Sequence, residues 1–309
     1  MKFAFLMDPL STVKAYKDTT YYIMLAAKER GHQVFHFDQP DLFVEHDQVL
    51  AHLTRLEVNA DTDKPFDILE RETTNLAEMD VVFIRTDPPF DRSYFYSTLL
   101  LDLLPSSTKV VNRPAGLRNW NEKLSALLFP DLTPRTMVTK EATDIKKFIA
   151  DVGRITLKPI DGHGGKGIHF LDQGDKHINE LIAQATHEGS HWIIAQAYVE
   201  EAKDGDKRIL LLNGEPLGAV LRLHPEGQEL NNLDAGGSAH PVELTERDLE
   251  VCARLKQPLI DQGILFSGID MLGPMLTEIN VTSPTGLQEL CRFSGIDHHH
   301  QIIQQIEIN

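Results

Sequence analysis

The sequence predicts an α/β protein, and three observations lead to that class. In the first third of the chain, apolar runs typical of strands alternate with helical patterns, which favours a parallel sheet covered by helices. From about Asn119 onward, short strands surround further helices, which indicates a change of lobe. A length of 309 residues, of which 41% are hydrophobic, allows two or three lobes with cores of their own.

The first third supplies the elements of the predicted parallel sheet. An apolar run at residues 2–7 predicts the first strand. A helix begins at Asp18, a favourable N-cap residue, and Gly31 can end it. Further strands are expected at 33–37, 81–84 and 109–112, and a further helix at 93–104. Ligands bind beyond the carboxyl ends of parallel strands, so we expect a site near Asp8-Pro9, 85–90 and 112–114.

The rest of the chain predicts two further groups of elements. Asn213-Gly214 separates two apolar strands and favours a tight hairpin turn. Residues 224–240 are polar and rich in glycine, which predicts a long loop that is either a lid or disordered. The other predicted strands are 135–138, 155–158, 167–171, 192–199, 207–212 and 217–223, and the predicted helices are 121–129, 143–151, 178–187, 245–262 and residues from 286 onward.

The composition disfavours several classes of function. A net charge of −16 argues against binding to nucleic acid or to an anionic membrane, so any phosphate site must be built locally. No apolar run is long enough to cross a bilayer, and the apolar start of the chain is too short for a signal peptide. Cys252 and Cys291 are the only cysteines, which implies no disulfide framework and fits a reducing compartment such as the cytoplasm.

A hairpin near the C-terminus carries oxygen ligands that suit a metal. Glu278 and Asn280 lie two residues apart in an apolar, β-branched segment, so their side chains share one face of a strand. Residues 268–272 predict a partner strand that brings Asp270 beside Glu278. Such oxygens suit Mg²⁺, which proteins often share with substrate phosphates. The alternative is a surface hairpin with solvated polar residues.

A glycine-rich segment joins two predicted strands in the middle of the chain. Gly162, Gly164 and Gly167 form a Gly-x-Gly-x-x-Gly pattern, and Gly165 is a fourth glycine within it. A strand follows the pattern, so a dinucleotide-binding fingerprint is excluded. A flexible loop of this kind can fold over a triphosphate, and Lys158 on the preceding strand adds a positive charge. The alternative is a surface turn with a solvated lysine.

Three more segments have both a functional and a purely structural interpretation. Residues 195–199 suit the edge and face of an adenine ring, or form a core strand that runs into a loop. Arg208, with Arg222 on the partner strand, could hold a phosphoryl group during its transfer. The alternative is that the charged segment 203–208 is a solvated turn. For His298-His299-His300 we expect a solvated helix face, since adjacent histidines on a helix point in different directions.

Several motifs together resemble those of bacterial glutathione synthetases, which belong to the ATP-grasp superfamily. The resemblance covers essentially the whole chain, from Met7-Asp8-Pro9 to the C-terminal helix. The motifs occur in the family's order: Asp87-Pro88-Pro89-Phe90-Asp91, Asn121-Glu122-Lys123-Leu124, Leu157-Lys158-Pro159 with its glycine loop, Asp204-Gly205-Asp206-Lys207-Arg208, and Leu276-Thr277-Glu278-Ile279-Asn280-Val281-Thr282-Ser283-Pro284-Thr285.

The resemblance implies three lobes and a role for individual residues. The lobes are an N-terminal parallel α/β lobe (1–118), a central α+β lid lobe (119–200) and a C-terminal ATP-grasp lobe with a mixed or antiparallel sheet (201–309). The implied ATP-binding residues are Lys123, Lys158, Gly164, Gly165, Gln196, Ala197, Tyr198, Val199, Asp206 and Met271. The implied ligands of Mg²⁺, or of Mn²⁺ in its place, are Asp270, Glu278 and Asn280. The residues implied to face the dipeptide are Arg85, Ser283, Pro284 and Thr285. The implied catalytic residues are Arg208 and Arg222.

The implied reaction is ATP-dependent ligation of γ-glutamylcysteine and glycine through an acyl phosphate. The resemblance also implies a cytoplasmic homo-oligomer, a tetramer, which binds neither nucleic acid nor membrane. The alternatives are another ATP-grasp ligase with different substrates and an ATP-binding regulatory protein without turnover. The sequence departs from the family in two places: an arginine expected near Asn231 is missing, and the tail from Asp297 to Asn309 differs from the usual ending.

Overall fold

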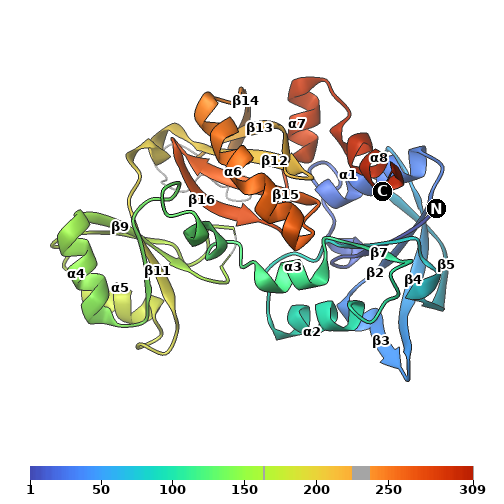
Figure 1. Cartoon of the computed structure of the whole chain (residues 1–309), viewed down its shortest axis with the longest axis horizontal. Coiled ribbons are helices and arrows are strands. Elements are labelled where there is room, and N and C mark those ends of the chain that lie inside the picture. Colours follow the sequence, from blue (N-terminus) through green and yellow to red (C-terminus); the bar gives the residue numbers. More distant parts are fainter. Residues whose placement is uncertain (163, 225–236, 309) are drawn as a thin grey trace.

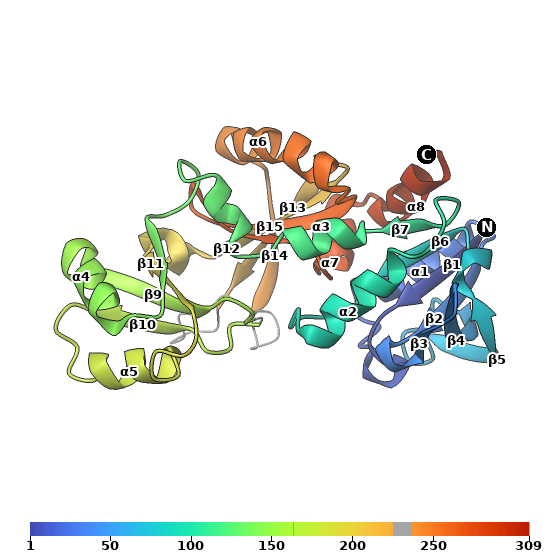
Figure 2. The ribbon, with the colours of Figure 1, turned by 60° about the horizontal axis from the view of Figure 1, so that its bottom comes forward.

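The computed structural model describes residues 1–162, 164–224 and 237–308, and their strands form three sheets (Figure 1). The order of the sheets in space differs from their order in the chain. Figures 1 and 2 both show the sheet of the C-terminal third between the N-terminal sheet and the sheet of the middle third. None of the described helices combines the length and the apolar character needed to span a membrane.

The N-terminal sheet has the strand order β3-β4-β2-β1-β6-β7, and β5 pairs with β4. Four predicted strands are present and parallel: β1 (Lys2–Leu6), β2 (Gln33–Phe37), β6 (Val81–Ile84) and β7 (Lys109–Val111). The sheet is mixed rather than wholly parallel because an antiparallel group extends it: β3 (Leu42–Glu45), β4 (Gln48–Val58) and β5 (Phe66–Asn75). The middle residues of β5 are exposed, so this strand lacks the apolar face by which a sequence pattern reveals a strand.

Two capped helices connect the parallel strands. In α1 (Thr19–Glu29), the predicted cap Asp18 accepts a hydrogen bond from the Tyr21 N–H at 2.8 Å. In α2 (Arg92–Leu101), Asp91 accepts from the Tyr94 N–H at 2.9 Å. Single 3₁₀ turns complete the lobe: η1 (Leu10–Thr12), η2 (Gln39–Asp41) and η3 (Leu76–Glu78).

The predicted helix at 121–129 is wrong. A short helix, α3 (Pro114–Asn119), ends before this segment, and only a 3₁₀ turn, η4 (Ser125–Leu128), lies within it. Proline at the first helical position presets the backbone for α3. The Asn121 side chain accepts hydrogen bonds from the N–H groups of Lys123 and Leu124 at 3.1 and 3.0 Å, which holds a turn instead of a helix.

The middle third forms an antiparallel sheet with the order β10-β9-β11-β8, close to the predicted ranges. Its strands are β8 (Thr136–Thr139), β9 (Arg154–Pro159), β10 (His169–Asp172) and β11 (Ile193–Ala197). Helices α4 (Ala142–Val152) and α5 (Ile178–Ala185) are amphipathic and cover this sheet with one apolar core.

The C-terminal sheet is antiparallel with the order β14-β13-β12-β15-β16. The 3₁₀ turn η5 (Glu200–Asp204) leads into it, and its elements are β12 (Asp206–Leu212), β13 (Glu215–Leu223), β14 (Ser238–Val242), α6 (Glu246–Gln262), β15 (Phe266–Leu272) and β16 (Met275–Asn280). Asn213 and Gly214 have φ of 51° and 76°, as the predicted hairpin turn requires. Of the predicted loop at 224–240, residues 225–236 lie outside the described residues, and 238–240 belong to β14.

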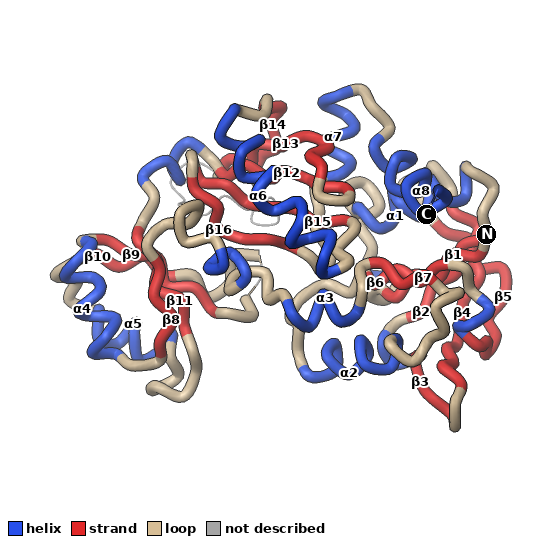
Figure 3. The backbone as a smooth tube through the Cα atoms, in the orientation of Figure 1, coloured by secondary structure: helices blue, strands red, loops and turns tan. Residues whose placement is uncertain are grey.

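The last two helices, α7 (Leu287–Ser294) and α8 (His298–Ile308), lie beside α1 (Figure 3). The predicted solvated face is wrong for two of the three histidines, because His298 and His299 are only 3% and 4% exposed, whereas His300 is partly exposed. The packing of α8 on α1 and α7 explains this burial. The Tyr22 ring stacks on His299 with 4.1 Å between centroids, and Ser294 Oγ lies 3.1 Å from His298 Nε2.

Asn112, directly after β7, joins the N-terminal sheet to the C-terminal sheet. Its amide donates to the carbonyl oxygens of Phe266 and Val281 at 2.7 and 2.8 Å, and its own oxygen accepts from the N–H groups of Leu265 and Phe266 at 2.8 and 3.0 Å. This contact places the carboxyl ends of the parallel strands against the turn that follows β16, where the predicted site residues lie.

Candidate active site

Two adjoining cavities lie at the C-terminal sheet, the first toward the central sheet and the second toward the N-terminal lobe. The first is lined by residues of β9, β10, β11, the glycine loop and the C-terminal sheet, and the second by the C-terminal sheet and the loops after β6 and β16. The two cavities share Gly164, Gly165, Ile168, Asp206, Asp270 and Glu278. A molecule in one cavity therefore lies next to a molecule in the other.

The first cavity combines apolar walls with a buried lysine. Phe170 and Tyr198 meet edge to face with 5.8 Å between their ring centroids, and Leu272 lines the opposite side. Lys158 Nζ donates to Gln196 Oε1 at 2.6 Å, and the Gln196 amide donates to Thr136 Oγ1 at 2.9 Å. Burial lowers the pKa of Lys158, and Glu278 partly opposes this shift. A flat apolar slot that ends in a cation suits a ring system joined to phosphate.

The glycine loop between β9 and β10 requires its glycines. Gly164, Gly165 and Gly167 have φ of 63°, 76° and 73°, a region that other residues rarely adopt. At Gly167 a Cβ would lie 2.8 Å from Pro159 Cγ. Lys123 Nζ donates to the Gly162 carbonyl oxygen, which connects the loop to the cation that faces it.

Two arginines and two aspartates form a buried cluster where the cavities meet. Arg208 Nε donates to Asp270 Oδ1, and Arg208 Nη2 donates to Asp270 Oδ2 at 2.9 Å. Arg208 Nη1 donates to the Thr285 carbonyl oxygen at 3.2 Å. Arg222 Nη2 lies 2.9 Å from Asp270 Oδ2 and 2.5 Å from Asp206 Oδ2. Asp270 therefore has two cationic partners, whereas Asp206 has a share in one.

This unequal sharing separates the acidities of the two aspartates. Burial alone would raise the pKa of Asp270, but Arg208 and Arg222 together hold it well below its ordinary value. Burial raises the pKa of Asp206 to about 7, because Arg222 only partly offsets it and the charge of Asp270 adds to the rise. Burial opposes the charge of Arg222, but Asp206 and Asp270 raise its pKa. The two carboxylates thus keep Arg222 charged inside the protein.

Three buried polar atoms around the second cavity lack a hydrogen-bond partner within the described part of the chain: Asp206 Oδ1, Arg222 Nε and Asn280 Nδ2. Unpaired buried polar atoms are rare in folded proteins. Their concentration here indicates a site that a polar ligand completes.

The β15–β16 hairpin presents the donor set expected for a metal. Asp270 pairs with Glu278 and Gly268 with Asn280, so all three predicted ligands lie on one face and line the second cavity. Lys123 Nζ lies 2.9 Å from Glu278 Oε1, and both Asp270 oxygens accept from arginines. Asp270 Oδ2 already contacts two arginines, whereas Asp270 Oδ1 and Glu278 Oε1 each contact one cation and keep a further lone pair. An all-oxygen set of this kind fits a hard divalent cation such as Mg²⁺.

The wall of the second cavity is held by a carboxylate and a serine. Glu122 Oε1 accepts hydrogen bonds from the Val281 N–H, the Thr282 N–H and the Thr282 hydroxyl at 2.8, 2.9 and 2.8 Å. Ser283 Oγ donates to Asp87 Oδ1 at 2.6 Å. Burial, reinforced by nearby Glu278, raises the pKa of Glu122. These contacts hold Thr282 and Ser283 in place, and residues 282–285 together form the wall of this cavity.

Most of the predicted site residues line these cavities. The first contains Lys123, Lys158, Gly164, Gly165, Gln196, Ala197, Tyr198, Val199, Asp206, Asp270 and Glu278, and the second also contains Arg208, Arg222, Asn280, Ser283, Pro284 and Thr285. Two predicted residues line neither cavity. Met271 is fully buried in the core, and Arg85 lies behind the wall, where it donates to the Pro284 carbonyl oxygen and to Thr20 Oγ1, both at 3.0 Å.

Sequence reasoning assigned no role to several lining residues. Leu272 could have been found, because strand alternation places it on the same face as Asp270. Ile168 and Phe170 are likewise two residues apart. Glu122 and Asp87 belong to two of the family motifs given above. Their partners, Thr282 and Ser283, are more than 150 residues away in the chain, so no local pattern connects them.

Comparison with known families covers nearly the whole chain. Residues 1–118 match the family described as "Prokaryotic glutathione synthetase, N-terminal domain", and residues 122–295 match "Prokaryotic glutathione synthetase, ATP-grasp domain". A glutathione synthetase of Synechococcus elongatus is 42% identical over 99% of this chain and 98% of its own. One from Mesorhizobium japonicum is 40% identical over 96% and 95%.

Solved structures similar to this chain are more distant in sequence. A D-cycloserine synthetase aligns over 99% of both chains with a TM-score of 0.70 at 16% identity. A macrocyclase from Microcystis aeruginosa, bound to its precursor peptide, aligns over 100% of both chains with a TM-score of 0.65 at 14% identity. At these identities the likeness concerns the fold alone.

Proposed function

We propose that this chain, which belongs to the prokaryotic glutathione synthetase family, joins γ-glutamylcysteine to glycine and converts ATP to ADP and phosphate. The use of ATP follows from the ATP-grasp domain. One observation supports the mechanism above all: the two cavities meet at Asp270 and Glu278. The terminal phosphate of a nucleotide in the first cavity then lies beside an acceptor in the second.

The proposed position of ATP is the first cavity, between the central and C-terminal sheets. The segment 196–199 binds the adenine, with Tyr198 against the ring, and Asp206 lies toward the ribose. Lys158, Lys123 and the glycine loop neutralise the phosphates. This arrangement fits a division into lobes at 1–118, 119–200 and 201–309, in which the central lobe closes over the nucleotide.

The metal proposed for this site is Mg²⁺, with Mn²⁺ as a substitute. Asp270, Glu278 and Asn280 would hold it, and when bound it neutralises phosphate charge during transfer. The protein's own cations share this task. Because Lys123 pairs with Glu278 and Arg208 with Asp270, each carboxylate is oriented before substrates arrive.

The proposed reaction has two steps. An oxygen of the cysteinyl carboxylate forms a bond to the γ-phosphorus of ATP as the bond to ADP breaks, which gives an acyl phosphate. The glycine amine then forms a bond to the acyl carbon, phosphate leaves, and the amine gives up a proton. Arg208 and Arg222 face the junction where charge builds up on the phosphoryl group and on the tetrahedral intermediate. The closed loops exclude water, which would hydrolyse the acyl phosphate.

The dipeptide is proposed to lie against the wall formed by residues 282–285. Ser283 and Thr285 offer polar groups, and Pro284 shapes the surface. Arg85 holds this wall from behind through the Pro284 carbonyl oxygen. Arg85 therefore contributes to dipeptide binding by holding this wall in position.

One assay separates the candidate functions. ADP release is measured with γ-glutamylcysteine and glycine, and in parallel with other carboxylate and amine pairs. Turnover that requires both γ-glutamylcysteine and glycine supports the proposal. Turnover with a different pair indicates another ATP-grasp ligase. ATP binding without turnover on any pair indicates a regulatory protein.

We also propose that the protein is a homo-oligomer, a tetramer as in the family resemblance, and that it acts in the cytoplasm. The two cysteines are free and buried, which suits a reducing compartment. Light scattering coupled to gel filtration tests the oligomeric state.

A further inference from the structure

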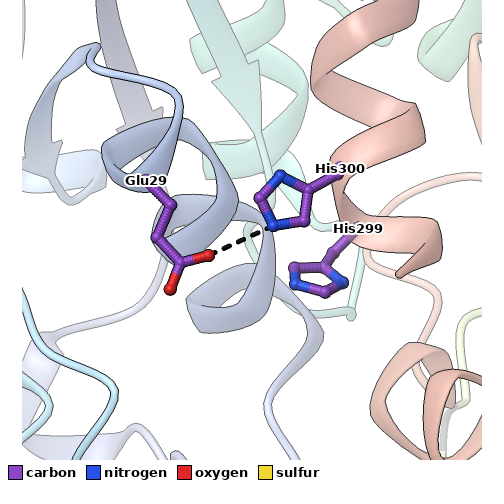
Figure 4. A group of neighbouring side chains, drawn as sticks. All are labelled: Glu29, His299 and His300. Atoms are coloured by element: carbon purple, nitrogen blue, oxygen red, sulfur yellow. Dashed lines mark hydrogen bonds and ion pairs between the residues drawn. The ribbon is translucent and has the colours of Figure 1, made fainter. Parts of the chain in front are cut away.

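Two of the three consecutive histidines on α8 face a carboxylate on α1, and none of these side chains lines either cavity. Figure 4 shows Glu29, the last residue of α1, opposite His299 and His300. One ligand atom from each of the three side chains lies within 4.8 Å of the others. Adjacent histidines normally diverge on a helix, but these ring centroids are only 4.5 Å apart. The cluster therefore brings together ligand types that the sequence spacing did not predict to converge.

The contacts of the His299 ring leave one of its two nitrogens available to a metal. Its ring stacks on Tyr22, and its Nδ1 lies 3.7 Å from Cys291 Sγ, which leaves Nε2 for a second partner. Metal-binding histidines commonly use one ring nitrogen for the metal and the other for such an outer contact.

Glu29 and His300 provide the accessible side of the cluster. His300 Nε2 lies 3.1 Å from Glu29 Oε2, and their side chains are 28% and 42% exposed. A metal can therefore enter from solvent, and a water can complete its shell. Ligand atoms around a tetrahedral zinc at about 2.0–2.1 Å lie roughly 3.4 Å from one another, a spacing that small rotations of these two partly exposed side chains can reach.

We propose that Glu29, His299 and His300 form a binding site for a transition metal ion of the Zn²⁺ type, which links the C-terminal helix to the first helix. Two imidazoles and one carboxylate are borderline ligands that favour Zn²⁺ or Co²⁺ over Mg²⁺. His298 takes no part, because Ser294 Oγ and Gln301 Oε1 contact its Nε2 and Nδ1 at 3.1 and 3.0 Å.

The site acts on the attachment of α8 and not on the reaction. The opposite end of α1 contacts the active-site wall: Thr20 accepts from Arg85, and Thr19 accepts from the Leu287 N–H. Glu29 lies at the far end of the helix. One further contact already fastens α8 near its end, where Glu307 accepts from Arg30 Nε at 3.0 Å. A metal adds a second fastening near the start of α8.

The test uses the full-length protein with excess Mg²⁺ and ADP, which occupy the all-oxygen site. Zn²⁺ is titrated by calorimetry, Tm is recorded with and without Zn²⁺, and Co²⁺ is added to detect the intense visible absorption of a tetrahedral site. We expect one equivalent of Zn²⁺ to bind and to raise Tm. His300→Gln and Glu29→Gln change solvent-accessible ligands and should each weaken Zn²⁺ binding by more than about tenfold while ADP release stays unchanged.

A matched control comes from the surface pair His177 and Glu180, whose Nδ1 and Oε2 also lie 3.1 Å apart. His177→Gln should leave Zn²⁺ binding, the Tm rise and the Co²⁺ absorption as in the unmodified protein. The proposal is overturned if His300→Gln binds Zn²⁺ as well as the unmodified protein, if His177→Gln loses the binding, or if no Zn²⁺ binds at all. These readouts do not depend on turnover, so they are independent of the proposed ligase activity.

Discussion

Arg208 and Asp270 form a buried ion pair in which one guanidinium contacts both carboxylate oxygens. A third contact, from Nη1 to the Thr285 carbonyl oxygen, fixes the guanidinium against the wall of the second cavity. The donor is therefore oriented before any substrate binds, as electrostatic stabilisation of a transition state requires.

Replacement of Arg208 should affect chemistry more than binding. In the proposed arrangement, Lys123, Lys158 and the glycine loop already provide for the phosphates of bound ATP. We expect Arg208→Ala to lower kcat and kcat/KM together by roughly a hundredfold, with the KM for ATP nearly unchanged. Arg208→Lys should recover little, since an ammonium cannot contact both oxygens of Asp270.

The control for this variant is Arg254→Ala, which removes an exposed arginine that also contacts both oxygens of one carboxylate, Asp131, at 2.9 and 3.3 Å. Its steady-state kinetics should match the unmodified protein. A loss in Arg208→Ala that is confined to the KM for ATP would show an ordinary phosphate-binding residue.

Glu278→Gln keeps the size of the side chain and removes its charge. Because Glu278 lies on the cavity surface, this change should lower turnover strongly while Tm shifts little. The measurement is ADP release over a Mg²⁺ titration, with thermal unfolding alongside. Glu215→Gln, which alters a surface pair with Lys256, is the matched control. Near-normal turnover of Glu278→Gln at saturating Mg²⁺ would rule out this residue as a metal ligand.

The glycine loop should change its hydrogen exchange when nucleotide binds. We expect the amides of Gly162, Gly164, Gly165 and Gly167 to exchange more slowly in the presence of a non-hydrolysable ATP analogue and Mg²⁺, because phosphate oxygens then accept from them. Helix α4, on the far side of the central core, serves as the internal reference. Equal exchange of the loop with and without the analogue would contradict its role as a lid.

Asn112→Ala should destabilise the folded protein. The change leaves two N–H groups and two carbonyl oxygens of the C-terminal sheet without their partners in a buried position. We expect the free energy of unfolding to fall by roughly 3–5 kcal/mol in denaturant titrations. Asn119→Ala, which removes an exposed contact with Gln262, should change it by less than about 0.5 kcal/mol. Similar values for the two variants would show that solvent replaces the Asn112 contacts.

The raised pKa of Asp206 predicts a pH-dependent term in stability. Its pKa rises from an unfolded value near 3.8 to about 7 in the folded protein. The folded state therefore holds this proton more tightly, and the resulting stabilisation is full below pH 3.8 and is lost as pH rises through 7. Asp206→Asn removes the term, so its Tm relative to the unmodified protein should increase between pH 4.5 and pH 8. A Tm difference that stays constant over this range would contradict the shift.

Local signals were sufficient for most of the elements and for the predicted ligand set. Asp18 begins α1, Asn213-Gly214 turns a hairpin, and strand alternation puts Asp270, Glu278 and Asn280 on one face. Each of these features depends on residues close together in the chain. The same reasoning placed the glycine loop between two strands.

Features that depend on distant residues were not accessible in this way. Residues 121–129 have the sequence pattern of a helix. The Asn121 side chain, however, accepts hydrogen bonds from the N–H groups of Lys123 and Leu124, and the segment begins with a turn. The burial of His298 and His299 follows from α1, which lies more than 260 residues earlier in the chain. Arg85 was expected to face the dipeptide, but its position behind Pro284 depends on a contact across 199 residues.

The position of the C-terminal sheet between the other two lobes has a consequence for synthesis on the ribosome. The N-terminal lobe emerges first, but the backbone groups that pair with Asn112 belong to residues made about 150 positions later. The central lobe likewise emerges before the strands that carry Asp270 and Glu278. Until those strands are translated, both earlier lobes expose the surfaces that will face the C-terminal sheet, and a nascent chain is open to chaperones at these surfaces. A chain released before Asp270 therefore lacks the proposed metal ligands and one wall of the first cavity, although the central-lobe wall of that cavity is already made.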